Sequence, residues 1–257
     1  MQNTIILSKK IVVSVLFHRN SKSLFKKFCL LLALLFLILY ITPALSSDKY
    51  KYEHFESQLG HFKELTLGRY VDNNDKRIVK WVKDVNIFVK GDIPSSLSSE
   101  LDILIVEINN IVRNVQLKRI TSEKQANYFI FLGAAEEYVS FESNYTLDML
   151  ERGGVFDIYY NSDYELVEGA MYMDIGRYKS SNIRKNLLRK LLTNSLGFPY
   201  ESRNHEYADS IFSGARFKRA ILNYSNFDKT IISKLYSECV KAGMDKFEVD
   251  NALLNGC

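Results

Sequence analysis

The chain has 257 residues, of which 47% are hydrophobic and 25% are charged. These values fit one sizeable domain or two small ones, and they exclude wholesale disorder, a collagen-like chain and a small disulfide-rich protein. Six of the 34 Lys and Arg residues lie within residues 1–47, which hold no Asp or Glu, so the other 28 basic residues face 30 acidic ones. Phosphate neutralisation needs a clustered excess of basic residues, so we expect no nucleic-acid partner.

An unbroken apolar run extends from Phe28 to Ile41, directly after Lys26 and Lys27. Small residues follow it, including Ala44 and Ser46, in the pattern that a signal peptidase reads. The run is short for a bilayer, since a spanning helix needs about 20 residues. A cleaved signal peptide and a retained membrane anchor, with membrane contact through residues 28–45, both stay open.

In either case the basic flank precedes the apolar run, and the positive-inside rule keeps such a flank in the cytoplasm. The sequence therefore predicts export of the chain from Ser47 onward, to the periplasm, the medium or the outer side of the membrane. We divide the chain into a leader at 1–46, a polar entry segment at 47–77 and a single domain at 78–257.

Two of the three cysteines, Cys239 and Cys257, fall on the exported side, where oxidation is permitted. A disulfide between them and a pair of free thiols are both compatible with the sequence, because neither residue belongs to a CxxC motif.

The first regular element expected is a strand at Val85 to Val89, which alternates apolar and polar residues and ends at Gly91. An amphipathic helix follows, because apolar residues recur at helical spacing from Leu97 to Val115. Several serines precede or open this helix and are expected to supply its N-cap. They are Ser95, Ser96, Ser98 and Ser99.

Tyr128 to Leu132 is short, aromatic and followed by Gly133, which is typical of a buried strand. Ala134 to Phe141 is expected to be a short helix. Val155 to Tyr160 and Leu166 to Ile175 flank a polar turn and predict an antiparallel hairpin.

A second strong helix is expected from an N-cap at Ser180 or Ser181, with its apolar face at Ile183 to Leu196 and its end at Gly197. Shorter helices are expected at Asp228 to Val240 and at Phe247 to Leu254. This order of elements predicts an α+β fold in which a mixed sheet packs against two long helices.

The helix before Gly197 is where a zinc hydrolase would place two histidines and a glutamate, in the pattern HExxHxxG. Counted back from Gly197, the three positions hold Lys190, Leu191 and Asn194. An ammonium repels a metal ion, leucine is not a base and an amide is a poor zinc ligand, so we expect no metal or other cofactor there. The same helix carries Arg184, Lys185, Arg189 and Lys190. Such a charged face is expected to be solvated, with an acidic partner as the alternative.

His205, Glu206 and Asp209 lie in a polar stretch after this helix and are interpreted as a solvated loop. A metal site that they complete with distant residues is the alternative. GxSxG and P-loop motifs are absent.

Four motifs in the C-terminal third carry a resemblance to a known family. They are Leu187 to Gly197, Asp209 to Phe212, Phe227-Asp228 leading to Leu235-Tyr236, and Ala242 to Asp245. In this order the chain resembles domain-of-unknown-function family 2927, exported bacterial proteins, over about Phe62 to Leu254. The resemblance implies a zincin-like fold with the helix before Gly197 in the place of the zinc helix. The family often has Glu and Gln where this chain has Leu191 and Asn194, so inherited catalysis is not expected.

The function that we expect is therefore a non-catalytic binding domain of the cell envelope. Its groove, between the hairpin and the helix, would take an extended peptide or an envelope polymer. The candidate residues are Lys190, Leu191, Asn194, Gly197, His205, Asp209 and Ser210. One alternative is a divergent metal-dependent hydrolase or peptidase that uses His205, Glu206 or Asp209. Another is a scaffold held at the membrane by the apolar run.

Overall fold

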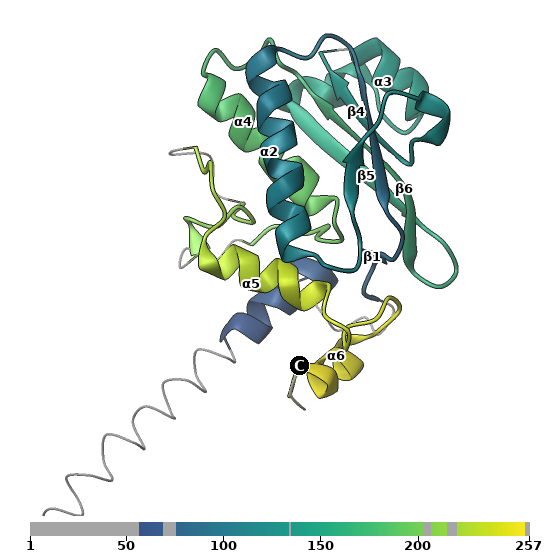
Figure 1. Ribbon diagram of the computed structural model, residues 1–257, viewed down its shortest axis with the longest axis vertical. Helices are drawn as coiled ribbons and strands as arrows, with labels where there is room; N and C mark the ends of the chain where they lie inside the picture. The colour runs from purple at the N-terminus through teal and green to yellow at the C-terminus, as the bar shows by residue number, and fades with distance from the viewer. Residues whose placement is uncertain (1–56, 69–75, 134, 203–206, 215–219, 255–257) are drawn as a thin grey trace, which may run out of the picture. The chain divides into compact units, whose positions relative to one another are not determined.

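The computed structural model describes residues 57–68, 76–133, 135–202, 207–214 and 220–254 (Figure 1). The expected leader at 1–46 lies outside the described residues, as does most of the entry segment. Among the residues that are described, no helix is both long and apolar enough to cross a membrane.

Six strands within the described residues form one sheet. They are β1 (Lys80–Trp81), β2 (Val85–Lys90), β3 (Leu117–Arg119), β4 (Tyr128–Leu132), β5 (Gly154–Tyr160) and β6 (Glu165–Met173). The hydrogen-bonded order is β1-β6-β4-β2-β3, and every neighbouring pair in it is parallel, whereas β5 pairs with β6 in the antiparallel direction. The expected first strand, buried strand and hairpin are confirmed. β1 and β3 were not expected, because strands of two or three residues are too short to show alternation.

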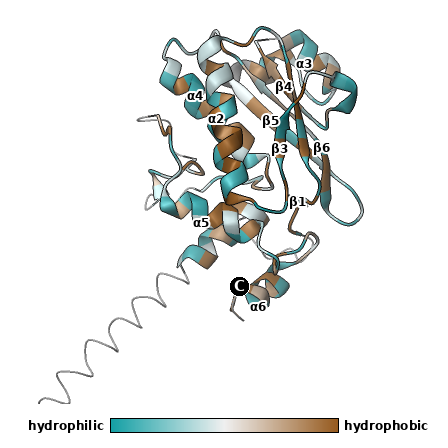
Figure 2. Ribbon diagram, in the orientation of Figure 1, coloured by the Kyte–Doolittle hydropathy of each residue, from teal (hydrophilic) through white to brown (hydrophobic). Residues whose placement is uncertain are grey.

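Helices cover both faces of this sheet (Figure 1). The strand β4 is buried on both faces and divides its side chains between two apolar clusters: Ile130 and Leu132 join the main core, and Phe129 and Phe131 join a second one. The main core packs under α2 (Ser95–Ile111) and α4 (Ser181–Asn194), and the second packs under the short helix α3 (Ala135–Phe141) and the 3-10 helix η2 (Leu147–Arg152). Apolar residues gather along α2 and the central strands (Figure 2). The molecule is a mixed α/β fold, and the expected packing of a mixed sheet against two long helices is confirmed.

Residues 57–67 are helical, although the sequence analysis placed them in a polar entry segment. Leu59, Phe62 and Leu65 of this helix are buried in the main core. The domain therefore begins before residue 78, and the spacing of three between these residues was a helical signal that the mixed polar composition masked.

Two further expectations about helix ends were wrong. The N-cap of α2 is Pro94, and the serines from Ser95 onward lie inside the helix, whose N-terminus has no side-chain capping hydrogen bond. The third predicted helix, α5 (Asn226–Leu235), ends five residues earlier than expected. It begins with a capping box between Ser225 and Asp228. The last helix, α6 (Lys246–Leu254), lies as expected.

The buried ammonium of Lys80 lies at the C-terminus of α5, where it donates to the carbonyls of Leu235 (2.8 Å) and Val240 (2.7 Å). Burial, aided by the positive charge of Lys241, lowers the pKa of Lys80 to about 8. A cation interacts favourably with the last carbonyls of a helix, so the contact with Leu235 stabilises the C-terminus of α5.

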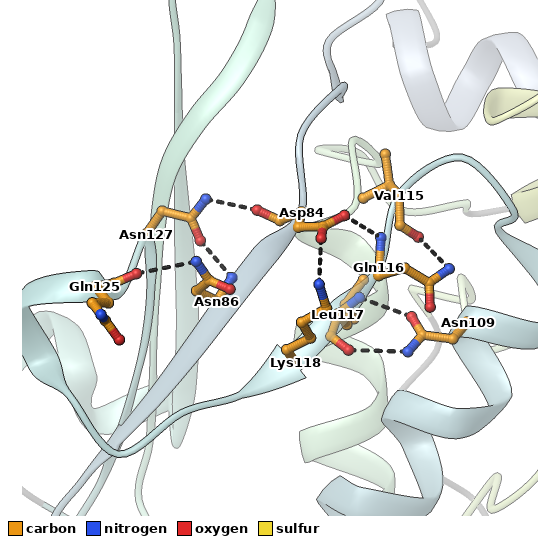
Figure 3. Close-up of polar contacts among 9 residues, drawn as sticks. All are labelled: Asp84, Asn86, Asn109, Val115, Gln116, Leu117, Lys118, Gln125 and Asn127. Carbon is orange, nitrogen blue, oxygen red and sulfur yellow. Dashed lines mark hydrogen bonds and ion pairs between the residues drawn. The ribbon is translucent and has the colours of Figure 1, made fainter.

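Polar side chains join the N-terminal ends of β2, β3 and β4 (Figure 3). The carboxylate of Asp84 accepts from the Gln116 backbone (3.0 Å) and pairs with Lys118 (2.5 Å). The amide of Asn127 bridges to the backbone of Asp84 and Asn86. These polar groups are used by neighbouring backbone, so we assign them a structural role rather than a binding role.

Candidate functional site

The helix α4, expected to form one wall of a groove, is enclosed by the rest of the domain. Every residue from 186 to 198 is buried. Lys190, Leu191, Asn194 and Gly197 therefore lie in the interior, and the helix side of the expected groove is not accessible. Its burial follows from its position between α2 on one side and the strands β5 and β6 on the other.

At the three positions counted back from Gly197, each side chain either makes a contact inside the domain or is enclosed by it. The ammonium of Lys190 pairs with Glu201 (2.6 Å) and donates to the carbonyl of Ser213 (2.8 Å). The side chain of Leu191 packs over Gly154, at the start of β5. The Oδ1 of Asn194 is buried and accepts no hydrogen bond in the described part of the chain. This set offers a metal ion an ammonium, an alkyl group and one amide.

The C-terminus of α4 is fixed by hydrogen bonds from three other elements. Tyr128 and the Ser195 hydroxyl lie 2.5 Å apart, the indole of Trp81 donates to the Ser195 carbonyl (2.9 Å), and Tyr236 donates to the Leu196 carbonyl (2.7 Å). Gly197 then turns the chain with a φ of 117° against the backbone of Val79. This end of the helix is a structural anchor.

The expectation that the cations of α4 form a solvated face was wrong for Arg189 and Lys190. Arg189 is 1% exposed. Its guanidinium pairs with Glu100 (2.9 Å) and Glu107, both on α2, and lies over the ring of Tyr224. Lys185 also pairs with Glu100, at 3.3 Å. The charges of α4 therefore hold two helices together, because a buried cation needs a carboxylate partner.

His61 is the one histidine in the described residues, since His18, His54 and His205 lie outside them. It is 3% exposed and packs against Tyr207 and Phe227, with ring centroids 3.9 and 5.1 Å away. Among the described residues, neither ring nitrogen has a hydrogen-bond partner. Burial lowers the pKa of His61 to about 4, although the nearby carboxylate of Glu64 opposes this shift. His61 is a neutral packing residue at physiological pH.

We expect the domain to lose stability in acid through His61. Between pH 6.5 and 4 the histidine is protonated in the unfolded chain and neutral in the folded one, so the unfolded state binds more protons and stability falls as the pH falls. The loss should approach about 3 kcal/mol at pH 4. Urea unfolding of the full-length chain at several pH values measures it. His61→Phe keeps an aromatic ring there and should remove this part of the pH dependence, and an unchanged dependence would contradict the assignment.

The other candidate residues do not belong to α4, and some of them lie outside the described residues. Ser210 is buried, and its hydroxyl donates to Asp228 (2.6 Å) at the start of α5, so it is structural. Asp209 is exposed, and His205 lies outside the described residues. Within the residues that the structure describes, no three His, Cys, Asp or Glu side chains are placed to hold a metal. Cys239 is disulfide-bonded, but Cys257 lies outside the described residues, so their pairing stays a prediction.

The free edge of β5 is a surface that the sequence analysis placed only as part of a hairpin. In the described sheet, β5 pairs with β6 alone. The backbone N–H of Asp174 donates to Gly153 (3.0 Å), and directions alternate along an antiparallel pair, so the backbone of Gly154, Phe156 and Ile158 points away from β6. These peptide groups can pair with another extended chain.

Side chains around β5 hold this edge rigid and give it an apolar border. Tyr138 and Tyr145 both donate to the carboxylate of Asp157, at 2.5 and 3.1 Å. Leu147 and Met149 of η2, which contacts β5, are about half exposed. The hairpin was readable from the sequence, but which edge stays unpaired depends on the strand order and could not be read from it.

The family model described as "Protein of unknown function (DUF2927)" matches residues 57–255. The chain belongs to this family. The first residue matched is also the first described residue of the buried helix, so the family unit includes that helix. None of the curated proteins matches this DUF2927 chain.

The solved structures to which the chain is similar include one of myroilysin and one of a fish hatching enzyme. A structure of myroilysin is 12% identical, with a TM-score of 0.39, over 62% of this chain and 83% of that one. High choriolytic enzyme 1, a hatching enzyme zinc-protease of the medaka fish Oryzias latipes, is 14% identical, with a TM-score of 0.33, over 61% of this chain and 94% of that one. Likenesses of this size carry no activity over to the DUF2927 chain.

Proposed function

We propose that this domain is a non-catalytic binding module, exported to the cell envelope, that holds an extended peptide along the free edge of β5. The observation that carries the proposal is the outward backbone of Gly154, Phe156 and Ile158 on a strand that has one partner in the described sheet. An exposed strand edge pairs readily with another chain, and natural proteins usually protect such edges. Peptide recognition by strand addition uses this kind of edge.

The border of the edge supports a peptide rather than a fully polar polymer. Alternate side chains of an added strand point to opposite faces of the sheet. On the η2 side they would meet the exposed apolar groups of Leu147 and Met149. The strand itself is already rigid, because Asp157 receives two tyrosine hydroxyls, and a rigid edge loses little entropy on binding.

The non-catalytic part of the proposal rests on the chemistry of α4. Lys190 is committed to Glu201 and to a backbone carbonyl, and Leu191 and Asn194 are buried. The alternative, a divergent metal-dependent hydrolase, needs ligands from residues such as His205, which lie outside the described part. Zinc analysis of the purified full-length chain separates the two, because stoichiometric zinc would favour the hydrolase.

Peptide binding is tested by two substitutions at one position of β5. Displayed dodecapeptides are selected on the full-length chain, and the Kd of each recovered peptide is measured. Ile158→Pro removes an outward N–H, so we expect the Kd to rise about ten-fold or more. Ile158→Ala removes the side chain but keeps the N–H, and we expect a change of about three-fold or less. Equal affinities of the two variants, or no recovered peptide, would show that β5 does not act in this way.

A further inference from the structure

A surface pocket of about 720 Å³ lies where the C-terminal end of α2 meets α5 and α6. This volume is in the range of pockets that bind small molecules. The pocket is lined by none of the candidate site residues named from the sequence and by no residue of β5. One wall comes from the last turn of α2 and the residues after it, and the opposite wall comes from α5 and the turn that follows.

Both walls present polar side chains that have no partner within the described part of the chain. Asn110, Arg113 and Asn114 stand on the first wall, and Lys229 and Ser233 on the second. Among the described residues, none of these five side chains makes a hydrogen bond or an ion pair. All five side chains are exposed, so they can reach a ligand held between the two walls.

The balance of charge around the pocket is positive. Arg113, Lys229 and Lys234 line it, against the single carboxylate of Glu238. Two unpartnered cations on opposite walls favour an anion between them, because charge-assisted hydrogen bonds to a carboxylate or a phosphate are the strong ones. The amides of Asn110 and Asn114 and the hydroxyl of Ser233 can both donate and accept, which suits neutral hydroxyl groups of a ligand.

We propose that this pocket binds a small polyhydroxylated anion, of the class of a phosphorylated or carboxylated sugar. The anionic group lies between Arg113 and Lys229, and the sugar hydroxyls meet the amide and hydroxyl side chains of the two walls. The proposal is independent of peptide binding at β5, because the two surfaces share no residue.

Calorimetric titration of the full-length chain with four probes tests the proposal. Glucose 6-phosphate and glucuronate represent the two anionic groups, and glucose and inorganic phosphate each lack one half of the ligand. We expect at least one charged sugar to bind about ten-fold more tightly than both glucose and inorganic phosphate. Tighter binding of glucose 6-phosphate identifies the anionic group as a phosphate, and tighter binding of glucuronate identifies it as a carboxylate. Affinity of inorganic phosphate equal to that of both charged sugars, or no binding below about 10 mM, would overturn the proposal.

Variants decide whether the pocket is the site. The double variant Arg113→Gln/Lys229→Gln should weaken the tighter charged sugar about ten-fold or more, and Glu238→Gln should tighten it. The control Lys83→Gln/Lys124→Gln removes the same charge from two exposed residues that do not line the pocket. It should change the Kd by about two-fold or less. An equal loss in the control, or no loss in the pocket variant, would overturn the assignment.

Discussion

Replacing Gly197 with alanine is expected to destabilise the domain by about 3–5 kcal/mol, or to prevent its folding. The backbone at Gly197 has a φ of 117°, which residues with a Cβ rarely adopt. A Cβ at this position would overlap the carbonyl oxygen of Val79 and lie 3.2 Å from Leu235. The backbone of Val79 cannot move away cheaply, because its neighbours Ile78 and Lys80 are buried and Lys80 is bound to the end of α5.

The control for this substitution is Gly60→Ala. Gly60 is an exposed residue of the helix at 57–67, and nothing lies within 4 Å of where its Cβ would be. The same change of one methyl group should therefore stabilise the domain by about 0.5–1 kcal/mol, since alanine is the better helix former. Urea unfolding of both full-length variants measures the difference. A Gly197→Ala variant as stable as the parent chain would show that the end of α4 is looser than the structure indicates.

Local signals were sufficient for most elements. The helix α4 formed as predicted but ends at Asn194, before the glycine that was expected to end it. The alternation in β2, the aromatic run in β4 and the polar turn between β5 and β6 each produced the expected element. These patterns depend on a few neighbouring residues, so a single sequence contains them. The two very short strands, β1 and β3, exist because neighbouring strands pair with them, and no local pattern marks such a pairing.

The environment of the candidate residues was much less predictable. The cations of α4 look like a solvated face in the sequence, because Lys and Arg are seldom buried. The burial of Arg189 depends on Glu100 and Glu107, which lie more than 80 residues earlier in the chain. The free edge of β5 and the pocket at the end of α2 depend in the same way on strand order and on helix packing. Sequence reasoning found the helix that matters for stability but not the surfaces that are open to a ligand.

Arg189→Met is expected to cost about 3–5 kcal/mol of folding stability, because it leaves the carboxylate of Glu100 buried without its main partner. Glu100 is 5% exposed, and only Lys185, at 3.3 Å, remains beside it. Glu107→Gln should cost about 1 kcal/mol or less, since its side chain is one-third exposed and water can replace the guanidinium. The difference in the free energy of unfolding between Arg189→Met and Glu107→Gln reflects the cost of leaving the buried carboxylate of Glu100 without its main partner.

The double variant Arg189→Met/Glu100→Leu shows whether Arg189→Met lowers stability because an ion pair is lost or because side-chain packing is lost. Apolar residues of similar volume can replace a buried ion pair at little cost, so the double variant should be more stable than the sum of the two single changes by about 1–3 kcal/mol. Free energies of unfolding in urea for the parent, both single variants and the double variant complete the cycle. If the effects simply add, Arg189 stabilises the domain through its packing on Tyr224 rather than through its charge. In that case the charge of Arg189 contributes little to the packing of α4 against α2.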